Sequence, residues 1–153
     1  MKITIASDHA GFGLKSRILR YLTEKNLETS DLGPDGRDSV DYPDFAVKVA
    51  MSVSDGRSDL GILICGTGIG MSIAANKVPG IRAALCHNVA TAEASRRHND
   101  ANVLVLGERV LDEATALQIV ETWLASEFDA GRHQKRIEKI RAIEQAEQAK
   151  HSH

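Results

Sequence analysis

The sequence predicts a three-layer α/β fold, in which helices cover both faces of a five-stranded parallel sheet. Strand-like runs alternate along the chain with stretches of helical periodicity, which is typical of βαβ units. A glycine-rich turn directly follows the third of these runs, at the place where a parallel strand would lead into a helix. The chain has 153 residues, of which 42% are hydrophobic, and this suits one domain with a sizeable core.

Five runs have the length and the apolar or β-branched content of strands. In chain order they are Lys2–Ala6, Glu28–Leu32, Leu60–Ile64, Ile81–Cys86 and Asn102–Leu106. The third run is apolar throughout, as a strand buried on both faces requires. We expect the first and third strands to lie side by side at the switch point of the sheet, where such folds bind ligands.

Five helical stretches alternate with these strands. They are Gly13–Lys25, Tyr42–Ser54, Gly68–Lys77, Val89–Arg97 and Asp112–Phe128. Pro43 suits the first turn of the second helix, and the turn-rich segment 33–38 before it can form the rim of a pocket.

A charged C-terminal helix follows the break at Asp129–Gly131. It carries a narrow apolar stripe, which can pack on its own domain or on a second subunit. The stripe consists of Ile137, Ile140, Ala142 and Ile143. We expect residues 1–144 to form a single domain and residues 145–153 to form a polar, frayed tail.

Composition excludes several classes of function. The net charge is −2, without long basic runs, so we expect no binding to nucleic acid. No run approaches the roughly 18 apolar residues of a membrane span, and Met1–Ala6 is too short for a signal peptide. Cys65 and Cys86 each close a separate apolar run, which favours reduced thiols in a cytoplasmic protein.

The turn Cys65–Gly70 reads Cys-Gly-Thr-Gly-Ile-Gly and is the best candidate site. Free N–H groups at the start of the next helix would bind an anion and acidify the Cys65 thiol, although a small buried cysteine is also compatible. Counting excludes a phosphatase loop and a Walker A loop, because Met71 stands where the first needs Arg and the second needs Lys. The Gly-x-Gly-x-x-Gly motif of dinucleotide-binding proteins is also excluded, because Met71 stands where its third glycine would be.

Three further polar groups are candidates for ligand contact. Asp8 and His9 follow the first strand, where an Asp can also cap a helix. His98 follows the fourth helix and is the best candidate for a proton carrier near neutral pH. Arg132 and Arg136 lie four residues apart on one helix face, where they can bind a phosphate together or be solvated. The histidines lack the short paired spacings of a zinc site, so we expect no metal.

Taken together, these segments resemble ribose-5-phosphate isomerase type B, from residue 2 to about residue 144. The segments that carry the resemblance are Ser7–Gly11, Asp41–Pro43, Gly61–Gly70, Ser72–Lys77, Arg97–Asn102 and Gly131–Arg136. The resemblance implies a Rossmann-like αβα fold, no metal or organic cofactor, and a homodimer or dimer of dimers whose sites are shared between subunits. The same family includes galactose-6-phosphate isomerase subunits and isomerases of other sugar phosphates.

The resemblance also implies catalytic roles for matched residues. Cys65 matches the base that moves a proton between C1 and C2 of the sugar, and Thr67 matches the hydroxyl that shuttles a proton between the oxygens. His98 and Asp8 match the residues that open the furanose ring. One branch of the family has Ser at the cysteine position and Glu four residues later. Here that later position is Ile69, so the chain follows the cysteine branch.

A second set of matched residues is implied to bind the substrate. The backbone from Gly66 to Gly70 matches an anion hole for the enediolate, Asn99 and Tyr42 line the sugar, and the remaining residues match or add phosphate contacts. The full set is His9, Tyr42, Gly66, Gly68, Ile69, Gly70, Asn99, Arg109, Arg132 and Arg136.

The expected function is therefore interconversion of D-ribose 5-phosphate and D-ribulose 5-phosphate through an enediolate. A first alternative keeps the mechanism and changes the substrate to a tetrulose 4-phosphate or to galactose or allose 6-phosphate. A second alternative is a sensor that binds a sugar phosphate without catalysis.

Overall fold

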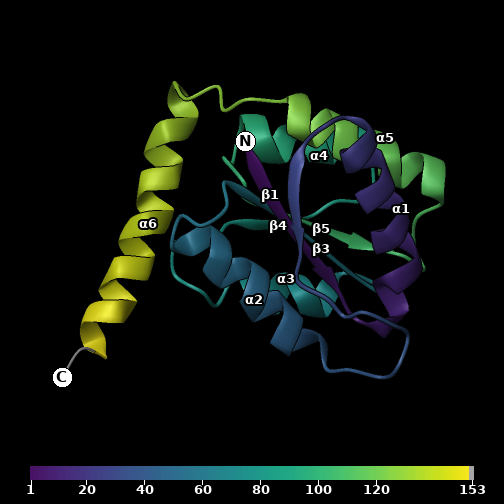
Figure 1. Ribbon diagram of the computed structural model, residues 1–153. Helices are drawn as coiled ribbons and strands as arrows, with labels where there is room; N and C mark the ends of the chain where they lie inside the picture. Colours follow the sequence, from purple (N-terminus) through teal and green to yellow (C-terminus); the bar gives the residue numbers. More distant parts are fainter. Residues whose placement is uncertain (152–153) are drawn as a thin grey trace.

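Five strands pair in the order β2-β1-β3-β5-β4, and every pair is parallel (Figure 1). The computed structural model describes residues 1–151. Its strands are β1 (Lys2–Ser7), β2 (Glu28–Asp31), β3 (Leu60–Cys65), β4 (Ala83–Leu85) and β5 (Val103–Gly107). The predicted five-stranded parallel sheet is confirmed.

Helices cover both faces of this sheet and make the three predicted layers. The core on one face joins the sheet to α1 (Phe12–Glu24), α4 (Val89–Arg97) and α5 (Glu113–Ala125). The core on the other face joins it to α2 (Tyr42–Ser54) and α3 (Ile69–Ala75). A short 3-10 helix, η1 (His9–Gly11), links β1 to α1, and α6 (Arg132–Lys150) lies outside the three layers in Figure 1.

Strand β3 lies at the centre of the sheet, between β1 and β5, and all six of its residues are buried. Ile62 and Ile64 pack into the core on the α1 side, whereas Leu63 and Cys65 pack into the core on the α2 side. This alternation is what a strand between two helix layers requires. The predicted pairing of the first and third strands is confirmed, and Ser7 of β1 lies opposite Ile64.

The observed boundaries of the elements agree best with the predicted ones where a capping residue or a proline marks the start of a helix. Helices α2 and α4 have the predicted bounds, and the side chain of Asn88 caps α4 by accepting a hydrogen bond from Thr91 N at 2.8 Å. Among the strands, the largest difference is β4, which is three residues long instead of six. It is an edge strand that pairs only with β5 in the described part of the chain, so few backbone partners are available to extend it.

The apolar stripe of α6 is divided between two environments. Ile137 is 1% exposed and packs on its own chain, but Ile140 and Ile143 are 46% and 66% exposed. The helix ends at Lys150 and so includes most of the polar segment 145–153, whose last two residues lie outside the described part of the chain. Within residues 1–151, no helix is long and apolar enough to cross a membrane.

An ion pair between a buried lysine and a partly exposed aspartate holds the loop that leads to α2. Lys15 is 1% exposed, and its Nζ donates to Asp31 Oδ1 at 2.9 Å and to the carbonyl of Pro34 at 2.7 Å. Asp31 Oδ1 also accepts from Gly33 N at 2.9 Å. Because Lys15 has almost no contact with solvent, this carboxylate offsets the cost of burying the ammonium group.

Asp31→Asn is expected to lower the free energy of unfolding by about 3 kcal/mol, because it leaves the buried Lys15 cation without its counter-charge. Lys15→Met is expected to cost less, since it removes the charge and keeps most of the volume. The matched control is Asp59→Asn, because the Asp59 carboxylate accepts a hydrogen bond from Lys2 N in an exposed position. Denaturant unfolding of the three variants checks this, and equal losses for Asp31→Asn and Asp59→Asn would contradict it.

Candidate active site

The Cys65 thiol lies at the carboxyl end of β3 and is in contact with the backbone of the glycine turn. It is 5% exposed, and Gly68 N donates a hydrogen bond to its Sγ at 3.1 Å. The sulfur therefore faces a backbone N–H donor inside the turn. The structure therefore confirms the predicted strand-to-helix turn and places a donor where the sequence suggests one.

Two glycines make this turn possible. Gly68 has a φ of +83°, and a Cβ there would lie 2.4 Å from Leu85 Cδ1. Gly107, at the end of β5, packs so closely that its Cβ would lie 2.6 Å from the carbonyl oxygen of Thr67. No larger residue fits at either position without moving the turn.

Cys86 gives a contrast within the same fold. It also follows a strand and is 1% exposed, but its Sγ faces the carbonyl oxygen of Ala84 at 3.7 Å rather than an N–H donor. Burial is the main cause of the raised pKa of the Cys86 thiol. The two cysteines therefore differ in their polar contacts, and the glycine turn supplies the N–H donor that Cys65 has and Cys86 lacks.

Asp8 and His9 meet Cys65 at the same edge of the sheet, as predicted. Asp8 N donates to the carbonyl of Ile64 at 3.1 Å, and the Asp8 carboxylate caps η1 by accepting from Gly11 N at 3.0 Å. Both the capping and the ligand-facing interpretations of Asp8 are thus compatible with its position. His9 Nδ1 accepts from Val40 N at 3.2 Å, so a neutral His9 carries its proton on Nε2 and can donate it to a ligand.

Thr67, Tyr42 and Arg109 complete this group of residues. Thr67 is exposed within the turn, and its hydroxyl accepts from Ile69 N at 3.3 Å. The ring of Tyr42 packs against Gly70, where a Cβ would lie 2.4 Å from Tyr42 Cζ. The guanidinium of Arg109 lies over Gly66, 3.1 Å from the place of a Cβ. We call the residues around this turn the thiol half-site: Asp8, His9, Tyr42, the turn Cys65–Gly70 and Arg109.

His98 and Asn99 lie at the opposite edge of the sheet. They follow α4 and precede β5, and the carbonyl of Asn102 accepts from Gly61 N at 2.9 Å near the start of β3. Cys65 is at the other end of β3, and the five steps between its six residues, at about 3.3 Å each, make the two ends roughly 17 Å apart. The predicted catalytic residues of one chain therefore do not converge on one point.

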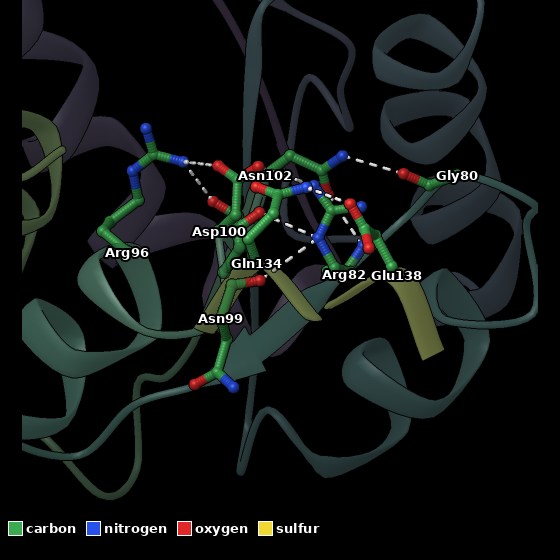
Figure 2. Close-up of polar contacts among 9 residues, drawn as sticks. Gly80, Arg82, Arg96, Asn99, Asp100, Asn102, Gln134 and Glu138 are labelled. Carbon is green, nitrogen blue, oxygen red and sulfur yellow. Dashed lines mark hydrogen bonds and ion pairs between the residues drawn. The ribbon is translucent and has the colours of Figure 1, made fainter. Parts of the chain in front are cut away.

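A polar network fixes the turn that carries Asn99 (Figure 2). Arg82 Nε donates to the carbonyls of Asn99 and Asp100 at 3.2 and 2.9 Å. Arg82 and Arg96 each form an ion pair with the Asp100 carboxylate, at 3.3 and 3.6 Å. Figure 2 shows the side-chain amide of Asn99 pointing away from this network, where it is free to meet a ligand.

His98 packs against α6. Its ring stacks on the ring of His133, with centroids 4.3 Å apart and an interplanar angle of 15°. One nitrogen of each ring and one carboxylate oxygen of Asp129 lie within 4.8 Å of one another. The histidine spacing along the chain does not reveal this cluster, because its members come from three separate segments.

The charges around this cluster argue against a resident metal ion. Arg97 Nε donates to both carboxylate oxygens of Asp129 at 3.2 Å. The pKa of His133 is lowered by burial first and then by the charges of His98, Arg132 and Arg136, while Asp129 opposes these effects. The Asp129 carboxylate is already paired with Arg97, and the other charged groups that act on His133 are cationic. This balance of charge favours an anionic ligand over a metal ion.

Arg132 and Arg136 begin α6 on one face, as predicted. Within residues 1–151 neither guanidinium has an ion-pair partner closer than 4 Å. We call this group the imidazole half-site: His98, Asn99, Asp129, Arg132, His133 and Arg136. Its cations are suited to a phosphate, and the thiol half-site is suited to proton transfer at carbon.

Comparison with known proteins agrees with this geometry. A ribose/galactose isomerase family model matches residues 3–140. Ribose-5-phosphate isomerase B of Escherichia coli is 49% identical over 144 residues, which cover 94% of this chain and 97% of that protein.

Two solved structures have the same fold. Ribose-5-phosphate isomerase B of Clostridium thermocellum superposes with a TM-score of 0.94 at 57% identity, covering 95% of this chain and 99% of that one. The Mycoplasma genitalium protein of the same name, solved with bound ribulose 5-phosphate, gives 0.90 at 46% identity, covering 94% and 96%. The resemblance to ribose-5-phosphate isomerase type B is confirmed, and the chain belongs to the ribose/galactose isomerase family.

Proposed function

We propose that the protein interconverts D-ribose 5-phosphate and D-ribulose 5-phosphate, with Cys65 as the base. The observation that carries this proposal is the hydrogen bond from Gly68 N to Cys65 Sγ within a turn of backbone donors. The E. coli relative and the M. genitalium protein with its bound ketose phosphate support the choice of substrate. The geometry supports an order of steps.

The first step opens the furanose ring. His98 donates a proton to the ring oxygen as the bond between C1 and that oxygen breaks, and Asp8 accepts the proton of the C1 hydroxyl. The products are a C1 aldehyde and a free C4 hydroxyl. A histidine suits this role because its imidazole exchanges protons near neutral pH.

The second step moves hydrogen between two carbons. The Cys65 thiolate removes the proton from C2, and the electrons move toward O1 to give an enediolate. Thr67 passes the proton of O2 to O1, and Cys65 returns its proton to C1, which leaves a ketone at C2. The thiolate is regenerated, so no other reactant is consumed.

The main barrier is the negative charge that develops on the enediolate oxygen. In the segment Gly66–Gly70, the backbone N–H groups that do not already donate to Cys65 Sγ or Thr67 Oγ1 can donate to this oxygen without reorganising. Removal of one such donor typically costs about 3 to 4 kcal/mol of barrier. The turn therefore serves both the base and the intermediate.

The substrate phosphate is bound by cationic and neutral donors. His9 Nε2 and Arg109 lie on the thiol half-site, and Arg132 and Arg136 lie on the imidazole half-site. Two arginines on one helix face can hold one phosphate through several charge-assisted hydrogen bonds. A phosphate held at one end fixes the open chain with C1 and C2 near the thiolate.

A complete site requires a second copy of the chain, because the two half-sites lie at opposite edges of one sheet. Exposed isoleucines flank both of them. Ile69 and Ile73 of α3 are 54% and 58% exposed near the thiol half-site, and Ile140 and Ile143 are exposed on α6. A groove of about 670 Å³ between α6 and the rest of the chain is lined by Ile140, Ile143 and Asn99. A two-fold homodimer brings each thiol half-site to the partner's imidazole half-site, twice.

Cys65→Ala is expected to lower kcat for ribose 5-phosphate by about 1000-fold, since it removes the base. The matched control is Cys86→Ala, which removes the other buried thiol and is expected to keep near-native turnover. Isomerisation assays on both purified variants check this. Deuterium incorporation from solvent at C1 or C2 by the unchanged protein separates an enzyme from a sensor. Near-native turnover by Cys65→Ala would contradict the assigned base.

Mixing two inactive variants tests whether sites are shared. Equal amounts of Cys65→Ala and His98→Asn chains are expected to recover about a quarter of native activity, because half of the dimers are hybrids with one intact site. Cys65→Ala mixed with Asp8→Asn is the control and is expected to recover none, because both changes lie in the same half-site. No recovery in the first mixture, with subunit exchange verified by mass spectrometry, would show that sites are not shared.

A substrate panel tests the choice of sugar. We expect kcat/KM to be highest for ribose 5-phosphate when it is compared with a tetrulose 4-phosphate, galactose 6-phosphate and allose 6-phosphate. The distance between the phosphate donors and Cys65 is set by the fold and by the proposed dimer, so a shorter or longer sugar misplaces C1 and C2. A higher kcat/KM for one of the other phosphates would reassign the substrate and leave the mechanism in place.

A further inference from the structure

We propose that Asp129 is a positioning residue for His98, which it holds in place together with the ring of His133. The proposal rests on the proposed function, because it concerns the step in which His98 opens the furanose ring. Asp129 lies in the linker between α5 and α6, outside every motif that carried the resemblance.

Asp129 is itself held firmly. Arg97, the last residue of α4, donates from Nε to both of its carboxylate oxygens at 3.2 Å. The main chain adds a second link, because Asp129 N donates to the carbonyl of Arg97 at 3.0 Å. Arg97 is held in turn by Glu93 at 3.0 Å. The linker is therefore attached to the last turn of α4, one residue before His98.

The backbone of His98 is fixed, but its ring needs further support. His98 N donates to the carbonyl of Ala94 at 2.8 Å as the cap of α4, while the residue itself is exposed. The ring finds that support in the parallel ring of His133 and in the Asp129 carboxylate, within 4.8 Å of both rings. A group at this distance can act directly through charge or through one bridging water.

The surrounding charges explain why a carboxylate is needed here. His133 faces the ring of His98 and the guanidinium groups of Arg132 and Arg136, and Asp129 is the group whose charge opposes theirs. Arg97 adds a third guanidinium on the far side of Asp129. Without Asp129, two imidazoles would stack among cations alone, and a protonated His98 would be repelled from its working position.

A comparison of the two sugars can distinguish a residue that positions His98 from a residue that only stabilises the fold. Ribose 5-phosphate must open its ring before C2 can lose a proton. Ribulose 5-phosphate carries its phosphate on the C5 oxygen and cannot close a furanose ring, so exchange of its C1 hydrogen with solvent requires Cys65 but no ring opening. A residue that positions His98 affects the first reaction and spares the second.

The test compares Asp129→Asn with the unchanged protein in both reactions. We expect kcat for ribose 5-phosphate to fall about tenfold, with KM changed less than about twofold. Deuterium exchange into C1 of ribulose 5-phosphate is expected to stay within about twofold of native. Asp129→Glu keeps the charge and is expected to restore most of the turnover. Glu127→Gln, an equal charge change two residues earlier in the linker, is expected to change neither rate.

A measurement without substrate makes the inference independent of the proposed function. In an NMR titration of the imidazole protons, Asp129→Asn is expected to lower the pKa of His133 further, because it removes the one charge that raises it. Equal losses in both reactions, or no loss in either, would overturn the positioning role. Absence of any isomerisation by the unchanged protein, with the NMR shift present, would instead refute the proposed function.

Discussion

All five strands of this sheet run in one direction, and this constraint decides how the site is built. Residues that follow a strand lie at one edge, and residues that precede a strand lie at the other. Cys65 ends β3 and His98 precedes β5, so the length of the sheet separates them within one chain. The proposed chemistry needs both groups at one sugar. The direction of the strands therefore makes a second copy of the chain a part of the proposed active site.

At the carboxyl edge, the proposed reactivity comes from the backbone as much as from side chains. Cys65 and Cys86 are both buried at strand ends, yet only Cys65 faces an N–H group. The difference is the glycine turn. It can form because Gly68 and Gly107 have no Cβ, and a Cβ at either position would collide with neighbouring atoms. In the proposed mechanism, neighbouring N–H groups of the same turn receive charge from the enediolate, so one turn contacts the base and stabilises the intermediate.

The sequence predicts most of the fold because its signals are local. The apolar run of β3, the helical stretch of α4 and the glycine turn each occupy consecutive residues, and each is found where expected. The thiol half-site also follows, since adjacent parallel strands bring Asp8 to Cys65. The buried Lys15 and the cluster of His98, Asp129 and His133 do not follow, because they depend on how separate segments pack. No periodicity links α4, the linker between α5 and α6, and α6 itself, and only the folded structure brings them together.

Helix α6 contributes both to the proposed dimer contact and to the proposed phosphate site. It presents two arginines without ion-pair partners among the described residues, followed by two half-exposed isoleucines. Burying the remaining exposed area of each isoleucine gains about 1 kcal/mol, while association of two chains costs about 4 to 15 kcal/mol. In the proposed dimer these side chains offset part of that cost, but they also bring together cations that repel one another. A bound sugar phosphate neutralises that repulsion, so substrate binding should strengthen the same contacts that complete the site.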